Sequence, residues 1–413
     1  MTTLPVNANH DYRLDNVNGT TEIDFGGAFT AIFNQSQFGG AGISNSVLLS
    51  GGLLGGTHPV IEVHITPGGT FSAASWDVAS GGFVDIRFIG GATAETITGS
   101  DHPNARHEFY GGDGADTLIG GVSDDLFVYA ATGDVEAGER IDGRGDDVDD
   151  DTISVRATND FRGASIDDIE HVEILGIGTT ATFFDDQLRV PGADFVDKDV
   201  MRIVAEKTVG TVQTLVVHAD PSGSGFDAYA SLKYVSFMNW GNEDQIFLMG
   251  TDGKDFLFGS SQADTIEAGA GKDRLSGRKG QDDLDGGAGK DWLDGGAGKD
   301  MLTGGVDKDS FVFAAPLKGG KNLDTVTDFQ AGDKIRLEKE DFSGLAKGKL
   351  AKDAFVSGDN LTKAKDAEDR IVYNETTGAL YFDKDGKGGA KAVKFAVLDG
   401  APDLEAADIV VFA

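Results

Sequence analysis

Seven aspartates stand nine residues apart in the second half of the chain, and carboxylates at a fixed spacing are suited to binding divalent cations. They are Asp255, Asp264, Asp273, Asp282, Asp291, Asp300 and Asp309. Each occupies the sixth place of a nonapeptide, and seven nonapeptides follow one another without insertion over residues 250–312. Glycine fills most of the first, second and fourth places. Because glycine adopts positive φ, backbone carbonyls can converge in a tight turn beside the carboxylate, and Ca²⁺ prefers such oxygen ligands.

The eighth place of each nonapeptide holds a large apolar residue: Leu257, Ile266, Leu275, Leu284, Leu293, Leu302 and Phe311. This predicts a short strand with its apolar side chain pointing inward. Two nonapeptides then complete one coil, so residues 18 apart stack, and the block forms about 3.5 coils over about 17 Å. Asp255, Asp273, Asp291 and Asp309 are expected along one edge, and Asp264, Asp282 and Asp300 along the other. Backbone carbonyl ligands are expected near Gly253, Gly269, Gly271, Gly287, Gly289, Gly296 and Gly298.

The pattern resembles the GGxGxDxUx repeat of RTX (repeats-in-toxin) proteins. Residues 286–294 and 295–303 match it fully, whereas Thr251, Gln262, Ala268, Arg278 and Asp307 depart from it in glycine places. The resemblance implies a calcium-loaded parallel β-roll. It further implies a bacterial protein that is secreted by a type I apparatus and holds several Ca²⁺ ions. Turns that lack the glycines are expected to bind calcium weakly or not at all.

A shorter block of the same kind lies upstream, in residues 90–128. Residues 111–119 match the repeat fully, with Asp116 in the sixth place, and residues 120–128 follow in register with Asp125. Glu95 takes the place of aspartate in residues 90–98, and an insertion over 99–110 interrupts the phase. We expect a short roll holding one or two ions, with carbonyl ligands near Gly112 and Gly114.

The remaining segments indicate β-structure, so the predicted class is all-β, with a β-roll in two blocks flanked by β-sandwich-like modules. Short alternating apolar runs predict an N-terminal β module of unknown role over 1–89. They predict a sandwich-like module or an extended β layer over 129–249. The main roll is predicted over 250–313. Residues 314–413 resemble the roll cap of serralysin-type exoproteins and a C-terminal secretion module. Their end resembles a type I secretion signal: Asp408, Ile409, Val410, Val411 and Phe412.

Composition restricts the classes of function. The 413 residues include 69 acidic and 35 basic side chains, a net charge of −34, which argues against nucleic acid as a partner because phosphate binding needs a basic face. The chain has no cysteine, so disulfides, zinc–thiolate sites and cysteine nucleophiles are excluded. No apolar run reaches the about 20 residues of a membrane span. The N-terminus shows no basic segment followed by an apolar one, so no secretory signal peptide is expected.

Catalytic motifs are missing from the sequence. It contains no HExxH zinc-protease helix and no GxSxG nucleophile elbow. We therefore expect a non-catalytic protein of the extracellular matrix or cell surface, or one with an adhesive role, with glycans or a second copy of the chain as partners. Two alternatives are a secreted polysaccharide-acting enzyme with its site in residues 1–89 or 129–249, and calcium-dependent self-processing at Asp220-Pro221.

Overall fold

The computed structural model describes residues 3–6, 8–13, 15, 17, 20, 22–25, 30–38, 48–51, 58–79, 82–144, 150–175, 178–188, 202–205, 212–219, 227–232, 236–238, 240, 244–317 and 321–413. This part of the chain is all β, with four 3₁₀ segments: η1 (Gln35–Gln37), η2 (Asp185–Leu188), η3 (Lys352–Ala354) and η4 (Ala406–Asp408). Two compact units result. The N-terminal unit comprises residues 1–183, 187–214 and 235–244, and the C-terminal unit comprises 184–186, 215–234 and 245–413.

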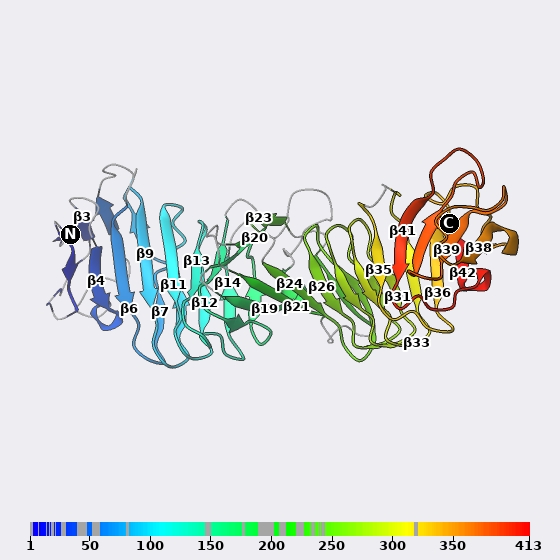
Figure 1. The fold of residues 1–413 in the computed structure, drawn as a ribbon. Coiled ribbons are helices and arrows are strands. Elements are labelled where there is room, and N and C mark those ends of the chain that lie inside the picture. Colours follow the sequence, from blue (N-terminus) through cyan, green and yellow to red (C-terminus); the bar gives the residue numbers. More distant parts are fainter. Residues whose placement is uncertain are drawn as a thin grey trace. The chain divides into compact units, whose positions relative to one another are not determined.

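In the N-terminal unit, most successive strands alternate between opposite sheets, so that the chain winds as a parallel coil (Figure 1). One sheet has the order β2 (His10–Asp11), β4 (Thr30–Asn34), β6 (Val60–His64), β9 (Val84–Ile89), β11 (Ala105–Tyr110), β13 (Leu126–Tyr129), β15 (Thr152–Val155), β18 (His171–Ile174), β20 (Arg202–Ala205) and β23 (Ser236–Met238). A second sheet has the order β1 (Thr3–Val6), β3 (Glu22–Phe25), β5 (Leu48–Gly51) and β8 (Asp77–Val78). A third has the order β17 (Ser165–Asp167), β14 (Arg140–Asp142), β12 (Thr117–Ile119), β10 (Thr96–Thr98) and β7 (Thr70–Ser72).

The structure differs in connectivity from the sandwich expected over 129–249, and the β module expected over 1–89 is connected in the same way. Strand pairs in these segments are parallel, as in β4 with β6 and β15 with β18, whereas a sandwich of this kind would have antiparallel sheets. β16 (Asn159–Asp160) also pairs in parallel with β19 (Thr180–Phe184). Short alternating strands fit both architectures. The coils here vary in length, so no constant period marks them in the sequence.

The C-terminal unit contains the main roll, in which two sheets face each other. One has the order β24 (Gln245–Met249), β26 (Asp264–Glu267), β29 (Asp283–Asp285), β32 (Met301–Thr303), β35 (Asp324–Val326), β41 (Val393–Leu398), β40 (Ala379–Phe382), β39 (Ile371–Asn374) and β38 (Phe355–Gly358). The other has the order β22 (Asp227–Ser231), β25 (Lys254–Phe258), β28 (Arg274–Ser276), β31 (Trp292–Asp294), β34 (Ser310–Phe313), β36 (Lys334–Glu338), β42 (Ile409–Phe412) and β37 (Gly348–Lys349). β21 (Thr214–His218) lies next to β24 in the first of these sheets.

The register confirms the predicted parallel β-roll. Leu257 of β25 pairs with Leu275 of β28, which pairs with Leu293 of β31, at the expected separation of 18 residues. All seven apolar residues in the eighth place are at most 1% exposed. One row of turns forms a third small sheet of β27 (Ala270–Gly271), β30 (Ala288–Gly289) and β33 (Val306–Asp307). The core of the roll is therefore a stack of identical apolar positions, one from each strand.

The two sheets of the roll continue past residue 313. β35 pairs in parallel with β32 and β36 with β34, so both strands extend the roll. β41 and β42 then add one parallel strand to each sheet. β39 and β40 form an antiparallel hairpin, and β40 pairs in the same sense with β41. The last strand of the chain is thus a structural strand of the roll.

Arg278 stands where the repeat has its second glycine and has a φ of 73°, in the left-handed region that costs a side-chain-bearing residue about 1–2 kcal/mol. We expect Arg278→Gly to raise the free energy of unfolding by about 1 kcal/mol, partly offset by the backbone freedom of glycine. Urea unfolding at saturating calcium measures this. Lys279→Gly is the control, because φ of Lys279 is not positive; this variant should be less stable by about 0.5–1 kcal/mol. Equal losses in both variants would contradict the prediction.

Candidate calcium sites

The aspartates of the main roll form two hydrogen-bonded columns. In each column the backbone N–H of one aspartate donates to Oδ1 of the aspartate one coil further on. The distances are 2.7–3.0 Å: Asp255 to Asp273, Asp273 to Asp291, Asp291 to Asp309, Asp264 to Asp282, and Asp282 to Asp300. The structure therefore brings together each set of carboxylates that the nine-residue spacing placed on one edge.

Both columns run further than the repeats. The N–H of Asp309 donates to Oδ1 of Asp333 at 3.0 Å, and that of Asp300 donates to Oδ1 of Asp324 at 3.2 Å. Each step spans 24 residues instead of 18. Asp328 closes the last turn by accepting the N–H groups of Gly304 and Gly305. These three aspartates lie beyond the last nonapeptide, so the nine-residue pattern does not predict them.

Two comparable columns exist in the N-terminal unit, with coils of unequal length. One links the N–H of Glu95 to Asp116 at 2.7 Å, and that of Asp116 to Glu139 at 2.8 Å. The other links Asp125 to Asp151 at 2.7 Å and Asp151 to Glu170 at 2.8 Å. The offsets of 21, 23, 26 and 19 residues explain why a search for a nine-residue period finds only Glu95, Asp116 and Asp125.

A shorter sequence pattern would have identified the additional acidic residues of the columns. Each is an acidic residue followed two places later by an apolar one, as in Glu139-Arg140-Ile141, Asp151-Thr152-Ile153, Asp324-Thr325-Val326 and Asp333-Lys334-Ile335. This acid–x–apolar triplet is the strand half of the nonapeptide without its glycines. The carboxylate column depends on that half, because the apolar residue anchors the strand in the core.

The second carboxylate oxygen divides the nine predicted ligands into two groups. In six of them Oδ2 is buried and has no hydrogen-bond partner within the described residues: Asp116, Asp273, Asp282, Asp291, Asp300 and Asp309. Leaving a buried charged oxygen unpaired is unfavourable unless a cation or proton compensates it. These six carboxylates therefore have the free oxygen that Ca²⁺ requires.

The other three aspartates have protein donors for both oxygens. Oδ2 of Asp255 accepts the N–H of Thr251, and Oδ2 of Asp264 accepts the N–H of Ser260; the hydroxyls of Thr251 and Ser260 add further bonds. In both turns a hydroxyl residue replaces the second glycine. Oδ2 of Asp125 accepts the N–H of Gly121 at 2.6 Å. These three residues were predicted as calcium ligands, but they lack the unpartnered Oδ2 that the other six aspartates share.

The carboxylate of Asp125 is hydrogen-bonded to a buried histidine. Nδ1 of His107 lies 2.6 Å from Oδ1 of Asp125, and both side chains have no exposed surface. The N–H of Ser100 donates to Nε2 of His107 at 2.9 Å, so the proton of the neutral ring is on Nδ1, which donates to Asp125. The imidazole lies against Gly99 and against Gly121, the second glycine of the nonapeptide 120–128. At this turn the hydrogen bond from His107 thus stabilises the buried carboxylate, as a bound cation would.

Backbone carbonyls complete the candidate sites, and glycine is needed where coils touch. A Cβ at Gly289 would collide with the carbonyl oxygen of Gly271, and one at Gly287 with that of Gly269; both glycines also have positive φ. The other predicted glycines are in similarly close contact with the turn of a neighbouring coil: Gly112, Gly114, Gly253, Gly269, Gly271, Gly296 and Gly298. In the described residues no three His, Asp or Glu side chains cluster as a metal centre, so carbonyl oxygens would supply most of the ligands.

Burial changes the protonation of the columns. Loss of hydration, and secondarily repulsion from neighbouring aspartates, raises the pKa of Asp282 to about 8 and that of Asp291 to about 7. Burial likewise raises the pKa of Asp116 to about 7 and those of Asp273 and Asp309 to about 6, and raises that of Asp300. A bound cation would favour the charged form that burial disfavours. The residues present therefore fit Ca²⁺.

Comparison with known proteins agrees with this geometry. The family model of the RTX calcium-binding nonapeptide repeat matches residues 108–134, 249–284 and 277–311, in four copies. The chain therefore carries RTX calcium-binding nonapeptide repeats of the hemolysin type, and these repeats bind Ca²⁺. A search of curated proteins gives no match to this chain. No helix among the described residues is long and apolar enough to cross a membrane.

The C-terminal segment resembling a secretion signal is folded into the roll. Ile409 and Val411 are at most 1% exposed in β42, and Asp408 forms an ion pair of 2.9 Å with Lys334. Export by this segment stays a prediction. Asp220-Pro221 lies outside the described residues.

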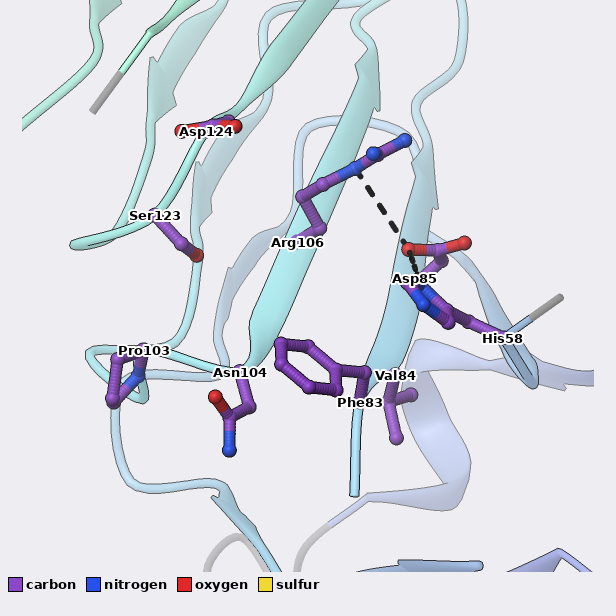
Figure 2. A pocket seen from close by; sticks show the side chains of 9 residues that line it. All are labelled: His58, Phe83, Val84, Asp85, Pro103, Asn104, Arg106, Ser123 and Asp124. Atoms are coloured by element: carbon purple, nitrogen blue, oxygen red, sulfur yellow. Dashed lines mark hydrogen bonds and ion pairs between the residues drawn. The ribbon is translucent and has the colours of Figure 1, made fainter. Parts of the chain in front are cut away.

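A cavity of about 180 Å³ in the N-terminal unit is separate from the columns (Figure 2). Asp85 and Asp124 line it together with Phe83, whose side chain is 41% exposed. The ring of Phe83 stacks on His58 at 5.5 Å, and Asp85 is within 3.4 Å of His58 and 3.8 Å of Arg106. Carboxylates beside an exposed aromatic ring are suited to a sugar, and this is the one observation that favours the polysaccharide-acting alternative.

The raised pKa values predict proton release on calcium binding. In calcium-free protein, an aspartate with a raised folded-state pKa contributes stability below its unfolded value of about 4, and this is lost as the pH rises through about 6–8. Calcium requires the carboxylate, so binding at about pH 6 should release more protons than at about pH 9, with higher apparent affinity at the higher pH. Calorimetry in buffers of different ionisation enthalpy measures the release. Equal release at both pH values would show that the columns are already ionised.

The difference between Asp116 and Asp125 predicts different calcium counts. Asp116→Asn should remove one bound ion, because it alters an unpartnered buried oxygen. Asp125→Asn should remove none but lower the free energy of unfolding by about 1–3 kcal/mol, since an amide NH₂ would face the N–H donor of Gly121. Equilibrium dialysis with a calcium assay counts the ions. A lost ion in Asp125→Asn would show that His107 does not replace calcium.

Proposed function

We propose that this protein is secreted, folds when it binds calcium outside the cell, and has a non-catalytic role at the cell surface or in the extracellular matrix. The observation that supports it is the set of six buried aspartates with an unpartnered Oδ2. Without calcium these carboxylates lie in columns of like charge, which opposes folding. With calcium, the same columns hold the coils together.

The energy available from calcium is of the order of a domain's stability. For a dissociation constant of about 0.1 mM and about 1 mM free calcium, each site contributes about 1.4 kcal/mol if only the folded state binds. Six such sites contribute about 8 kcal/mol, within the usual range of about 5–15 kcal/mol for folded proteins. The chain has no cysteine, so calcium takes the stabilising role that disulfides have in many secreted proteins.

The placement of the C-terminus supports secretion before folding. A type I apparatus would have to recognise the segment from Asp408 to Phe412 in an unfolded chain, because β42 is hydrogen-bonded into the roll in the folded one. Scarce calcium inside the cell keeps the roll open, and abundant calcium outside closes it. Glycans or other copies of the chain are the proposed partners in the extracellular space.

A second candidate is a secreted polysaccharide-acting enzyme with its site at the cavity of Asp85 and Asp124. The favourable observation is that two carboxylates and an exposed aromatic ring line one hollow. Two acidic side chains flanking a glycosidic bond are the usual requirement for glycoside hydrolysis.

Calcium removal tests the primary proposal. In EGTA the circular dichroism of the full chain should lose most of its β signal, and millimolar Ca²⁺ should restore it. The same concentration of Mg²⁺ should not, because Mg²⁺ demands a stricter octahedral shell and keeps its waters. Asp282→Asn should shift the midpoint to higher calcium, whereas the matched Asp283→Asn, an exposed neighbour, should not.

Two results would contradict the proposal. An unchanged β signal in EGTA would exclude calcium-driven folding. Reducing ends released from a polysaccharide by the wild type but not by Asp85→Asn would replace the non-catalytic role with the enzymatic alternative.

A further inference from the structure

The two outer faces of the main roll differ in charge. In the first, third, fifth and seventh nonapeptides, lysine precedes the sixth-place aspartate: Lys254, Lys272, Lys290 and Lys308. In the second, fourth and sixth, the same place holds Ala263, Gln281 and Lys299. Because alternate nonapeptides form opposite sheets, these lysines gather along the sheet of β25, β28, β31 and β34. The chain carries a net charge of −34, so a row of cations on one edge is a local exception.

The outward strand positions repeat this asymmetry. Along the sheet with the lysines, the seventh place aligns Phe256, Arg274, Trp292 and Ser310. Along the opposite sheet, the seventh place aligns Thr265, Asp283 and Met301, and the ninth aligns Glu267, Asp285 and Thr303. One outer face therefore carries cations and aromatic rings, and the other carries carboxylates. We call the cationic surface of Lys272, Arg274, Lys290, Trp292 and Arg336 the basic face.

Trp292 is at the centre of the basic face, with an arginine from each side. Cζ of Arg274 lies 5.5 Å from the centroid of the indole ring, and Cζ of Arg336 lies 4.6 Å from it. Phe412 packs edge-on against the same ring at 5.8 Å. These contacts join β28, β31, β36 and β42. The aromatic ring holds two guanidinium groups in place, which keeps them available to a ligand.

The cations of the basic face are not neutralised by the protein. Nε of Arg336 is buried and has no hydrogen-bond partner. Within the described residues no ion pair joins Arg274, Arg336, Lys272 or Lys290 to a carboxylate. The nearest acidic side chains along these strands have other neighbours: Asp294 accepts the N–H of Gly296, and the pKa of Glu338 is raised by burial and by Asp341 and Glu340. In a chain with twice as many acids as bases, unpaired arginines point to an anionic ligand.

We propose that the basic face binds an anionic polysaccharide of the uronate type. A carboxylate on the sugar accepts paired N–H bonds from a guanidinium group, and the face of Trp292 covers the apolar side of a sugar ring. The surface is a flat parallel sheet with strands about 4.8 Å apart, which suits an extended polymer better than a small molecule. The inference names the partner class of the surface or matrix role proposed above, and rests on it.

The acidity of the rest of the chain does not prevent this binding. At physiological ionic strength charges are screened beyond about 8 Å, so the arginines and lysines dominate the field close to the face. Bound calcium further reduces the negative charge of the columns inside. A nucleic acid is less favoured, because its phosphates follow at about 1.7 Å of duplex length per charge and would extend over the acidic surroundings.

A matched pair of lysines tests the proposal. Residues 286–291 and 295–300 have the same sequence, so Lys290 and Lys299 occupy identical repeat positions on opposite sheets. Binding of an oligogalacturonate to the full, calcium-loaded chain is measured by calorimetry and by tryptophan fluorescence. Lys290→Gln combined with Arg274→Gln should weaken binding about five-fold, whereas Lys299→Gln should change it less than about two-fold. Trp292→Phe should remove the fluorescence response.

Control ligands separate the possible outcomes. A sulfated oligosaccharide distinguishes general anion binding from uronate binding, and tighter binding of the sulfated form through the same residues would overturn the uronate assignment. Equal binding of a neutral dextran, or of an oligonucleotide through the same residues, would overturn the proposal. So would a loss of affinity in Lys299→Gln equal to that in Lys290→Gln combined with Arg274→Gln. Calcium-dependent folding is measured separately by circular dichroism. A chain that folds with calcium but does not bind the oligosaccharide would therefore disprove the uronate inference and leave the proposed calcium-dependent folding intact.

Discussion

The structure depends on one repeated interaction, the hydrogen bond from the amide of each column aspartate to Oδ1 of the aspartate one coil further on. This bond fixes the height and register of neighbouring coils, and it places each carboxylate inside the molecule beside the turn carbonyls. Its consequence is that one carboxylate oxygen is used by the protein while the other is buried. The identity of whatever satisfies that second oxygen determines the behaviour of each turn.

Three solutions to this constraint occur in the chain. At six aspartates no protein group reaches Oδ2, and calcium or a proton is required. At Asp255 and Asp264, a threonine or serine in the second turn place donates to both carboxylate oxygens, so neither oxygen is left without a partner. At Asp125, Oδ2 accepts the N–H of Gly121, and the imidazole of His107 is hydrogen-bonded to Oδ1. The chain therefore combines column aspartates that keep a buried, unpartnered oxygen with column aspartates whose two oxygens are both hydrogen-bonded.

The same arrangement separates stability from recognition. Inward positions and turns are restricted by the core and the columns, whereas the seventh and ninth places of each nonapeptide face outward and are free to vary. In the main roll this freedom has produced a cationic, aromatic face on one sheet and an acidic face on the other. Both surfaces come from the same repeat, because alternate nonapeptides always lie on opposite sheets.

The sequence alone determined the parts that follow from local geometry and a constant period. Seven phased aspartates and seven phased apolar residues are enough to predict the roll, its two columns and its calcium chemistry, because each nonapeptide forms one turn and one strand. Only the tertiary structure decided which aspartates keep an unpartnered oxygen, since this depends on whether the turn directs an N–H group at Oδ2, as Gly121 does for Asp125. It also decided that residues before 90 and after 129 wind in parallel, because coils of 19 to 26 residues have no fixed period to detect. Asp324 and Asp333 extend the columns for the same reason: the strand half of the repeat maintains the column after the glycines that mark it have gone.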